Sequence, residues 1–362
     1  MSSRTVLPRL LTSSKVPRLF PRMKRLCSYL ALLLIATPRV PSQTITNPTP
    51  REHFASAVTL YDWASDSAGH KLRMLVTRPK DTSRKVPAIF FVGWLSCDSV
   101  EYPQGGTDGF GAIFWRLIET SGYATVRLDK AGVGESEGDC SKLDFNTELT
   151  GYQSAFDKML KYDFIDSGKI IVAGLSNGGG TSALIPRDHT VRGYIAASSW
   201  GRTWYEHMLE LERGRLARAA KSPGEVNVGV KVFTEFYHLY LIHHLTPGQV
   251  LAQRPEWKSW WYDQPDGQYG RPAAFYQQLQ ALNLGDAWAA VAAPVLVLHG
   301  SADTLMSDAD SRAIADTVNQ AHPEMARYAV VPGGDHLLSV NGKLEESVVP
   351  TMLQWMTEQL KN

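Results

Sequence analysis

The chain has 362 residues, of which 44% are hydrophobic and 20% are charged. This length suffices for one large globular domain or two small ones, and the composition excludes an intrinsically disordered protein. The 37 basic and 36 acidic residues give a formal net charge of +1, which argues against a nucleic-acid binder that relies on bulk positive charge. Residues 1–50 hold eight of the basic residues and no acidic residue, so residues 51–362 keep 29 basic and 36 acidic residues, a formal charge of −7.

Residues 1–42 have the pattern of an export signal peptide. Met23 opens a short basic stretch, and residues 29–36 form an apolar run that is too short to cross a bilayer. A small-residue cleavage pattern predicts a mature start near Gln43 and a secreted or periplasmic protein without a membrane span. Met23 is an alternative start, and an organelle transit peptide is the competing interpretation, because residues 1–25 are rich in Arg and Ser.

Strands and helices alternate along most of the remaining chain. Residues 58–63 and 71–77 are alternating segments separated by turn-forming residues, which predicts a β-hairpin. Short apolar runs typical of a buried parallel sheet follow at residues 86–92, 124–128, 170–173, 191–197, 294–298 and 327–331. Helical patterns lie at residues 110–120, 145–162, 178–184, 307–320 and 344–360. This order predicts an α/β fold with a mostly parallel sheet flanked by helices.

Residues 201–293 interrupt the alternation between residues 55–200 and 294–362. They contain no convincing strand and are rich in aromatic residues, which predicts a helical insertion between two strands. Trp200 and Trp204 are candidates for lining a substrate pocket at the sheet edge, whereas the other aromatic residues could equally form the insertion's own core. No metal or cofactor is expected, because the chain has no Cys/His cluster and no nucleotide-binding loop.

A candidate nucleophile lies in the Gly-x-Ser-x-Gly sequence of residues 174–178. The motif follows a buried-strand run and precedes a helix, which is the context in which a serine is held in a strained turn above a sheet edge. Gly174 and Gly178 fit the tight turn, where a side chain would collide. Ser176 is therefore predicted to be the nucleophile.

A serine hydroxyl needs a histidine that takes its proton and a carboxylate that orients the histidine. Asp303 and His336 each lie just past the C-terminal end of a predicted strand, in the chain order Ser, Asp, His. Asp308 and Asp310 are weaker candidates for the acid, because they fall in or near the next helix. Asp335 is expected to shape the histidine loop.

The oxyanion of the reaction needs two backbone N–H donors. The amide of Asn177, the residue after the nucleophile, is the first candidate. The second is expected from the loop after residues 86–92, at Trp94 or else at Leu95.

Together these residues resemble the α/β-hydrolase superfamily over about residues 55–362. The resemblance includes residues 91–94, the Asp-x-x-Gly-x-Gly-x-Ser turn of residues 129–136, the Ser176 turn, and the loops of residues 298–303 and 334–336. Within the superfamily the chain is similar to exported bacterial esterases and prolyl-oligopeptidase-like hydrolases. The resemblance implies an eight-stranded sheet and a helical cap over the site.

In such folds the loops after the third and fourth strands are neighbours. Cys97 and Cys140 fall in these two loops, so the resemblance implies a disulfide between them, with two free thiols as the alternative.

Three functions fit these observations. The first is a serine hydrolase that cleaves carboxylic esters or thioesters of small molecules through an acyl-enzyme. The second is a serine peptidase acting on short peptides, for which Glu206, Glu210 or Glu212 could hold a peptide terminus. The third is a non-catalytic binding module on the same fold.

Overall fold

The computed structural model describes residues 51–361 apart from residues 82 and 108. The predicted signal peptide lies outside the described residues. An eight-stranded sheet has the order β1-β2-β4-β3-β5-β6-β9-β10. Within it β2 runs antiparallel to both of its neighbours, and all other adjacent strands are parallel. The strands are β1 (Ala57–Ser65), β2 (Lys71–Pro79), β3 (Val86–Val92), β4 (Ala124–Leu128), β5 (Ile165–Leu175), β6 (Gly193–Ala197), β9 (Val295–Gly300) and β10 (Ala326–Val331).

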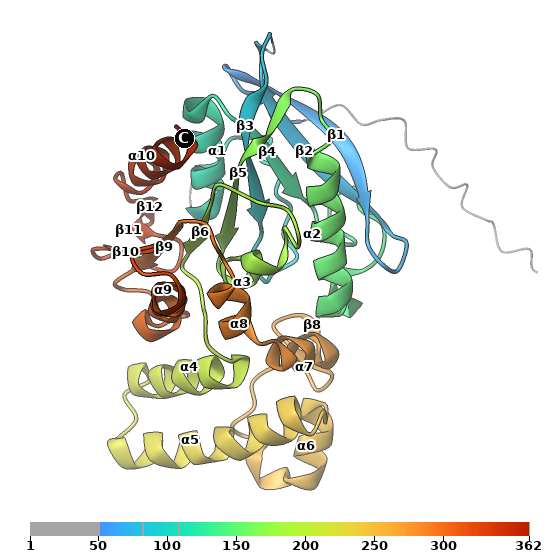
Figure 1. The fold of residues 1–362 in the computed structure, drawn as a ribbon. Coiled ribbons are helices and arrows are strands. Elements are labelled where there is room, and N and C mark those ends of the chain that lie inside the picture. The colour runs from blue at the N-terminus through green and yellow to red at the C-terminus, as the bar shows by residue number, and fades with distance from the viewer. Residues whose placement is uncertain (1–50, 82, 108, 362) are drawn as a thin grey trace, which may run out of the picture. The chain divides into compact units, whose positions relative to one another are not determined.

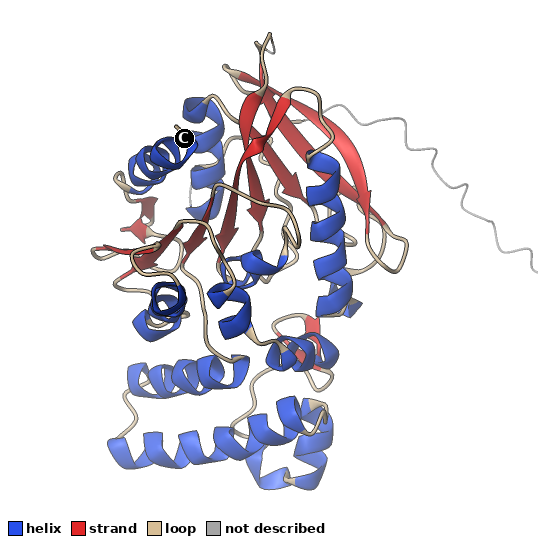
Figure 2. Ribbon diagram, viewed as in Figure 1, coloured by secondary structure: helices blue, strands red, loops and turns tan. Residues whose placement is uncertain are grey.

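Helices cover both faces of this sheet (Figures 1 and 2). Successive residues of β3 point to opposite faces, so Ala88 and Phe90 join one buried cluster while Ile89 and Phe91 join another. α1 and α10 pack on the Ile89 face, and α2, α8 and α9 pack on the Phe90 face. These helices are α1 (Gly109–Ser121), α2 (Phe145–Met159), α8 (Leu284–Ala289), α9 (Asp308–Ala321) and α10 (Val348–Leu360). The predicted α/β class, with a mostly parallel sheet flanked by helices, is confirmed.

The segment between β6 and β9 is largely helical, as its sequence indicates. A hairpin of two-residue strands interrupts the helices there, and the sequence pattern does not reveal it. The elements are α4 (Trp204–Arg218), α5 (Pro223–Tyr237), η3 (His238–Ile242), α6 (Pro247–Gln253), η4 (Pro255–Trp257), β7 (Gly267–Gln268), β8 (Arg271–Pro272) and α7 (Ala273–Ala281). In Figure 1, α4, α5, α6 and α7 extend beyond one end of the sheet.

Short elements complete the fold near the strand ends. They are η1 (Cys140–Lys142), α3 (Asn177–Thr181), η2 (Ser182–Leu184), β11 (Ser339–Val340) and β12 (Lys343–Leu344). The last two form a hairpin in place of the helix start predicted at residue 344, and the C-terminal helix begins only at Val348.

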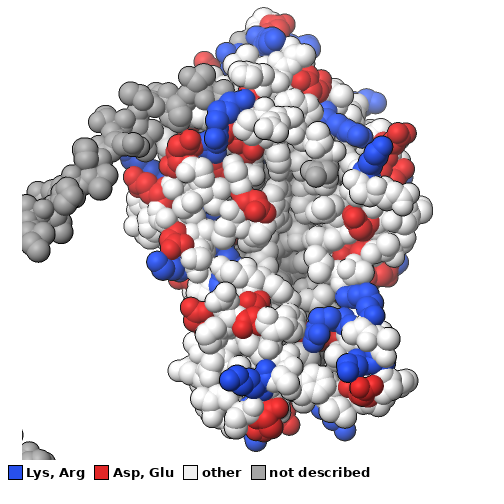
Figure 3. Space-filling view, turned by 180° about the vertical axis from the view of Figure 1, so that it is seen from behind, with Lys and Arg blue, Asp and Glu red and all other residues white. Residues whose placement is uncertain are grey.

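The surface of the described residues carries charges of both signs. On the face in Figure 3, basic and acidic side chains are interspersed around a central strip of uncharged residues. No helix in the described part of the chain is long and apolar enough to cross a membrane.

Candidate active site

Ser176 stands in the turn between β5 and α3. Its φ of 54° lies in the left-handed region that non-glycine residues rarely adopt, so the backbone is strained there. A Cβ at Gly178 would come within 2.3 Å of the Gly93 carbonyl oxygen, and one at Gly174 within 2.4 Å of the Gly178 carbonyl oxygen. Only glycine fits these two positions, which is why the motif can form so sharp a turn.

The structure brings the hydroxyl, imidazole and carboxylate predicted from the sequence together. His336 Nε2 lies 2.9 Å from Ser176 Oγ, and His336 Nδ1 lies 2.9 Å from Asp303 Oδ2. The other oxygen of Asp303 accepts hydrogen bonds from the amides of Leu305 and Met306, at 2.8 and 3.0 Å. An ionised carboxylate can only accept, so Nδ1 carries the proton, and Nε2 is then free to accept the serine proton in a neutral ring.

The loop after β10 gives His336 its position. The Asp335 carboxylate accepts hydrogen bonds from the amides of Leu337 and Ser339, both at 2.9 Å. Asp335 therefore shapes this loop, as the sequence suggested. Asp310, considered as an alternative acid, contacts His207 instead of His336.

A cavity of about 570 Å³ opens over Ser176 and His336. Its walls are mostly apolar, and they come from the loop after β3, the start of α1, helix α4 and the two loops that carry Asp303 and His336. The apolar and aromatic residues that line it include Trp94, Phe110, Trp204, Leu211, Met306 and Leu337. A cavity of this size and polarity suits a small substrate with an apolar chain or ring.

The two tryptophans predicted for the pocket have different surroundings. Trp204 lines the cavity. Trp200 does not: it is fully buried, its ring packs against Trp204 at 5.0 Å, and its indole lies close to the backbone of Gly180. Trp200 is thus a core residue, contrary to the expectation, because Trp204 and His207 of α4 pack against its ring and the backbone of α3 lies beside its indole.

Asn177, Trp94 and Leu95, the expected oxyanion donors, all line the cavity. Lys130, the second residue after β4, donates hydrogen bonds to the carbonyl oxygens of Trp94, Leu95 and Ser96. The C=O and N–H of a trans peptide point in opposite directions, and the described residues contain no cis peptide. The Leu95 amide, in the same peptide as the Trp94 carbonyl, therefore faces away from Lys130.

Lys130 belongs to a buried chain of charges that reaches the helical segment. Its ammonium lies 3.5 Å from Glu148 of α2, which also pairs with Arg271 of β8. Arg271 in turn donates a 2.8 Å hydrogen bond to the carbonyl oxygen of Cys140. Burial lowers the pKa of Lys130 to about 8, although Glu148 opposes this shift.

A disulfide joins Cys97 to Cys140, and thus ties the loop after β3 to the loop after β4. The pairing implied by the resemblance is present. Together with the hydrogen bonds from Lys130, it holds the cavity loop in place.

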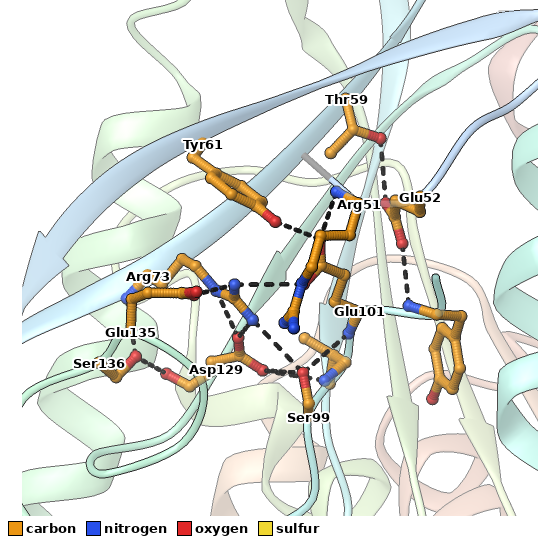
Figure 4. A network of polar contacts seen from close by, with 12 residues as sticks. Arg51, Glu52, Thr59, Tyr61, Arg73, Ser99, Glu101, Asp129, Glu135 and Ser136 are labelled. Carbon is orange, nitrogen blue, oxygen red and sulfur yellow. Dashed lines mark hydrogen bonds and ion pairs between the residues drawn. The ribbon is translucent and has the colours of Figure 1, made fainter. Parts of the chain in front are cut away.

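A second buried network holds residues 99–101 of the same loop (Figure 4). One carboxylate oxygen of Asp129 accepts from the Val100 amide at 2.9 Å and from the Ser99 hydroxyl at 3.2 Å. The other accepts from Arg73 Nε at 2.7 Å, and Arg73 also pairs with Glu101. Burial raises the pKa of Asp129, and the charge of Arg73 opposes the shift. Asp129 and Lys130, adjacent in sequence, thus hold two parts of one cavity loop.

The glutamates considered for a peptide terminus do not line the cavity. Glu206 closes the capping box of α4 with Thr203. Glu212 is fully buried and accepts hydrogen bonds from Arg215, Tyr237 and Tyr262. Glu210 is exposed on the same helix, away from the cavity.

Sequence reasoning also missed His207. It lines the cavity from α4 and is only 3% exposed. A single histidine in an aromatic-rich helix carries no motif, so no sequence signal marked it. For Lys130 there was a signal, since it stands inside the Asp-x-x-Gly-x-Gly-x-Ser turn, but the motif does not say what its variable positions contact.

The sheet order and the serine turn define an α/β hydrolase. A family model described as serine aminopeptidase, S33, matches residues 109–341, more than half of the chain. The chain belongs to this family and is a serine hydrolase. No curated protein matches it.

Solved structures share the fold at low sequence identity. Est1E from Butyrivibrio proteoclasticus, in a structure with bound ferulic acid, is 18% identical with a TM-score of 0.56, over 83% of this chain and 100% of Est1E. Acetyl xylan esterase 1 from Thermoanaerobacterium is 14% identical with a TM-score of 0.51, over 86% of each chain. The Pyrococcus furiosus esterase Pf2001 is 14% identical with a TM-score of 0.51, over 84% of this chain and 90% of the esterase.

Proposed function

We propose that the protein hydrolyses carboxylic esters or thioesters of small molecules through an acyl-enzyme on Ser176. The observation that carries the proposal is the pair of 2.9 Å hydrogen bonds that links Ser176, His336 and Asp303 at the wall of an apolar cavity. The esterases among the structural neighbours have the same fold and add support.

The reaction follows from this geometry. Ser176 Oγ gives its proton to His336 Nε2 and attacks the substrate carbonyl carbon, and Asp303 stabilises the imidazolium that forms. The amide of Asn177 and that of Trp94 or Leu95 donate to the developing oxyanion. His336 then gives the proton to the departing alkoxide or thiolate. Water, deprotonated by the same imidazole, releases the acid from Ser176.

The helical segment of residues 201–293 acts as a cap in this proposal. Trp204, His207 and Leu211, spaced three and four residues apart on α4, line the cavity opposite the strand ends. The cap would admit small substrates and exclude folded proteins. Secretion or a periplasmic location remains a prediction from residues 1–42, and the disulfide is compatible with it.

A peptidase is the second candidate, and the family's description as serine aminopeptidase favours it. The three glutamates considered for binding a peptide terminus do not line the cavity, which favours the ester hydrolase. The two activities are distinguished by measuring, on one preparation, the hydrolysis of short-chain aryl esters and of aminoacyl and dipeptidyl arylamides. Faster turnover of the arylamides would establish the peptidase instead.

Replacement of the nucleophile tests the chemistry shared by both candidates. Ser176→Ala is expected to lower kcat for the preferred substrate by roughly 10⁴-fold or more and to leave the thermal unfolding midpoint close to that of the wild type. Ser182→Ala, in the next short helix, is a control that should retain activity. Full activity of Ser176→Ala would contradict the proposal.

A further inference from the structure

Helix α4 places a second histidine at the cavity that holds Ser176. His207 lies on the helix face it shares with Trp204 and Leu211, and all three residues line the cavity. Its side chain is 3% exposed, so the surface that it retains belongs to the cavity wall. The steps of ester hydrolysis described above do not use it.

One ring nitrogen of His207 is fixed by a buried carboxylate. Nδ1 lies 3.1 Å from Asp310 Oδ2, and Asp310 also accepts from Arg202 at 2.8 and 3.0 Å and from the amide and hydroxyl of Ser307. Burial would raise the pKa of Asp310, but the hydrogen bond from His207, with the other contacts, holds it well below its usual value. Asp310 is therefore ionised, and Nδ1 is the donor.

The only hydrogen bond of the His207 ring within the described part of the chain is the one at Nδ1. Nε2 is not one of the fully enclosed polar atoms without a partner, so it keeps accessible surface, and this surface lies at the cavity that His207 lines. A polar atom that faces an apolar-walled cavity without a protein partner is available to a polar group of the ligand.

We propose that His207 is a specificity-determining residue that hydrogen-bonds, through Nε2, to a hydroxyl group that the ester substrate carries away from its scissile bond. With Nδ1 protonated, a neutral ring accepts at Nε2, and a protonated ring donates there. A hydroxyl group both donates and accepts, so it can form a hydrogen bond with Nε2 of the neutral ring and of the protonated ring. The apolar walls at Trp94, Phe110 and Leu211 suit the chain or ring that bears the hydroxyl. This inference rests on the proposed ester hydrolysis.

The test compares substrates that differ only in the hydroxyl. Methyl ω-hydroxyalkanoates are paired with methyl alkanoates that end in a methyl group at the same length, which probes the acyl side. Acetates of α,ω-diols paired with acetates of n-alkanols probe the alcohol side. The wild type is expected to prefer the hydroxylated member at the best length in at least one series, by about 10- to 100-fold in kcat/KM. Absence of a preference in both series overturns the proposal without any variant.

Variants of His207 distinguish recognition of the substrate hydroxyl from a purely structural role of this residue. His207→Phe is expected to abolish the preference, so that the two members of each pair are hydrolysed with similar kcat/KM, and the ratio between them is the quantity that tests the proposal. His207→Gln, which keeps a polar group, should restore part of the preference, and His53→Phe is the matched control at an exposed histidine. An equal loss for both members of each pair would assign His207 a purely structural role and overturn the proposal.

Failure of the proposed function has a different signature. In that case the esters are not hydrolysed, whether or not a fluorophosphonate labels Ser176: labelling without ester hydrolysis would indicate the peptidase, and absence of both would exclude the serine chemistry altogether. Hydrolysis of unsubstituted esters with normal labelling, but without a hydroxyl preference, counts only against His207.

Discussion

Single residues at the serine turn and beneath the cavity loop set the chemistry of this site. Ser176 is held at a positive φ, and glycine at positions 174 and 178 lets neighbouring backbones approach to distances that a Cβ would block. Lys130 fixes three successive carbonyl groups of the loop that is expected to supply one oxyanion donor. A preorganised donor is effective because it needs no rearrangement during the reaction.

Replacement of Lys130 tests its positioning role. Lys130→Met removes the donor to the carbonyl groups of Trp94, Leu95 and Ser96, so kcat for a short aryl ester should fall about 10- to 100-fold with little change in KM. Steady-state kinetics measure this split between kcat and KM. Lys142→Met, at a lysine whose side chain is 83% exposed, is the control. An unchanged kcat in folded Lys130→Met would show that the loop holds its position without the ammonium.

The sequence predicts the three residues of the proposed catalytic triad better than it predicts the residues that support them. Ser176, Asp303 and His336 each follow a strongly apolar strand, and the chain order limits the choices. Lys130 could not be identified in the same way, because burial of a lysine depends on which carbonyl groups the fold brings to it. His207 lacks a motif altogether. Side chains that act through tertiary contacts leave no local pattern.

At the scale of elements, helix α4 joins the cavity to the start of α9. Thr203 and Glu206 form its capping box, and Arg202 and His207 both bind Asp310 in the first turn of α9. The loop between β9 and α9 also carries Asp303. The contact between α4 and α9 therefore braces the aspartate loop as well as the cavity wall.

The contact at Asp310 predicts a pH-dependent stability. Its pKa in the folded protein is below the usual value of 3.8, so its stabilisation is fully present above about pH 4. As the pH falls further, the unfolded chain takes up the proton first, and the stabilisation is lost. Urea unfolding should show Asp310→Asn less stable than the wild type by about 2–4 kcal/mol at pH 7, and the difference should narrow toward pH 3.

Asp308→Asn provides the control for this experiment, since Asp308 lies on the same helix turn but is largely exposed. The free energy of unfolding of Asp308→Asn should be close to that of the wild type at every pH. If the difference in the free energy of unfolding between Asp310→Asn and the wild type stayed constant from pH 7 to pH 3, the assignment of an ionised carboxylate in the folded state would be contradicted.

For the whole molecule, the sheet can be predicted from the sequence, whereas details of the helical segment and the pairing of the cysteines depend on the complete fold. Apolar runs mark parallel strands such as β3 and β6, because both of their faces are buried under helices. The helical segment between β6 and β9 is recognisable from its composition. Its β7–β8 hairpin and the packing of its helix α4 on the buried Trp200 are not. The pairing of Cys97 with Cys140 depends on the neighbouring positions of two loops, and so on the fold as a whole.

Removal of the disulfide tests this connection between the loops. The sequence separation of 43 residues corresponds to a loss of at most about 4 kcal/mol in the free energy of unfolding on the chain-entropy model. The double variant Cys97→Ser/Cys140→Ser should unfold at a lower urea concentration than the wild type, and dithiothreitol should lower the midpoint of the wild type alone. A wild-type midpoint that is insensitive to reduction would show that the bond adds no stability.

The reactivity of Ser176 tests directly whether this serine is the nucleophile. The intact enzyme is treated with a fluorophosphonate, and the modified residue is identified by peptide mass spectrometry while ester hydrolysis is followed in parallel. One label per chain is expected, on Ser176, with loss of hydrolysis in proportion to labelling and no label on Ser176→Ala. A label on another serine, or hydrolysis that persists after Ser176 is fully modified, would contradict this role of Ser176.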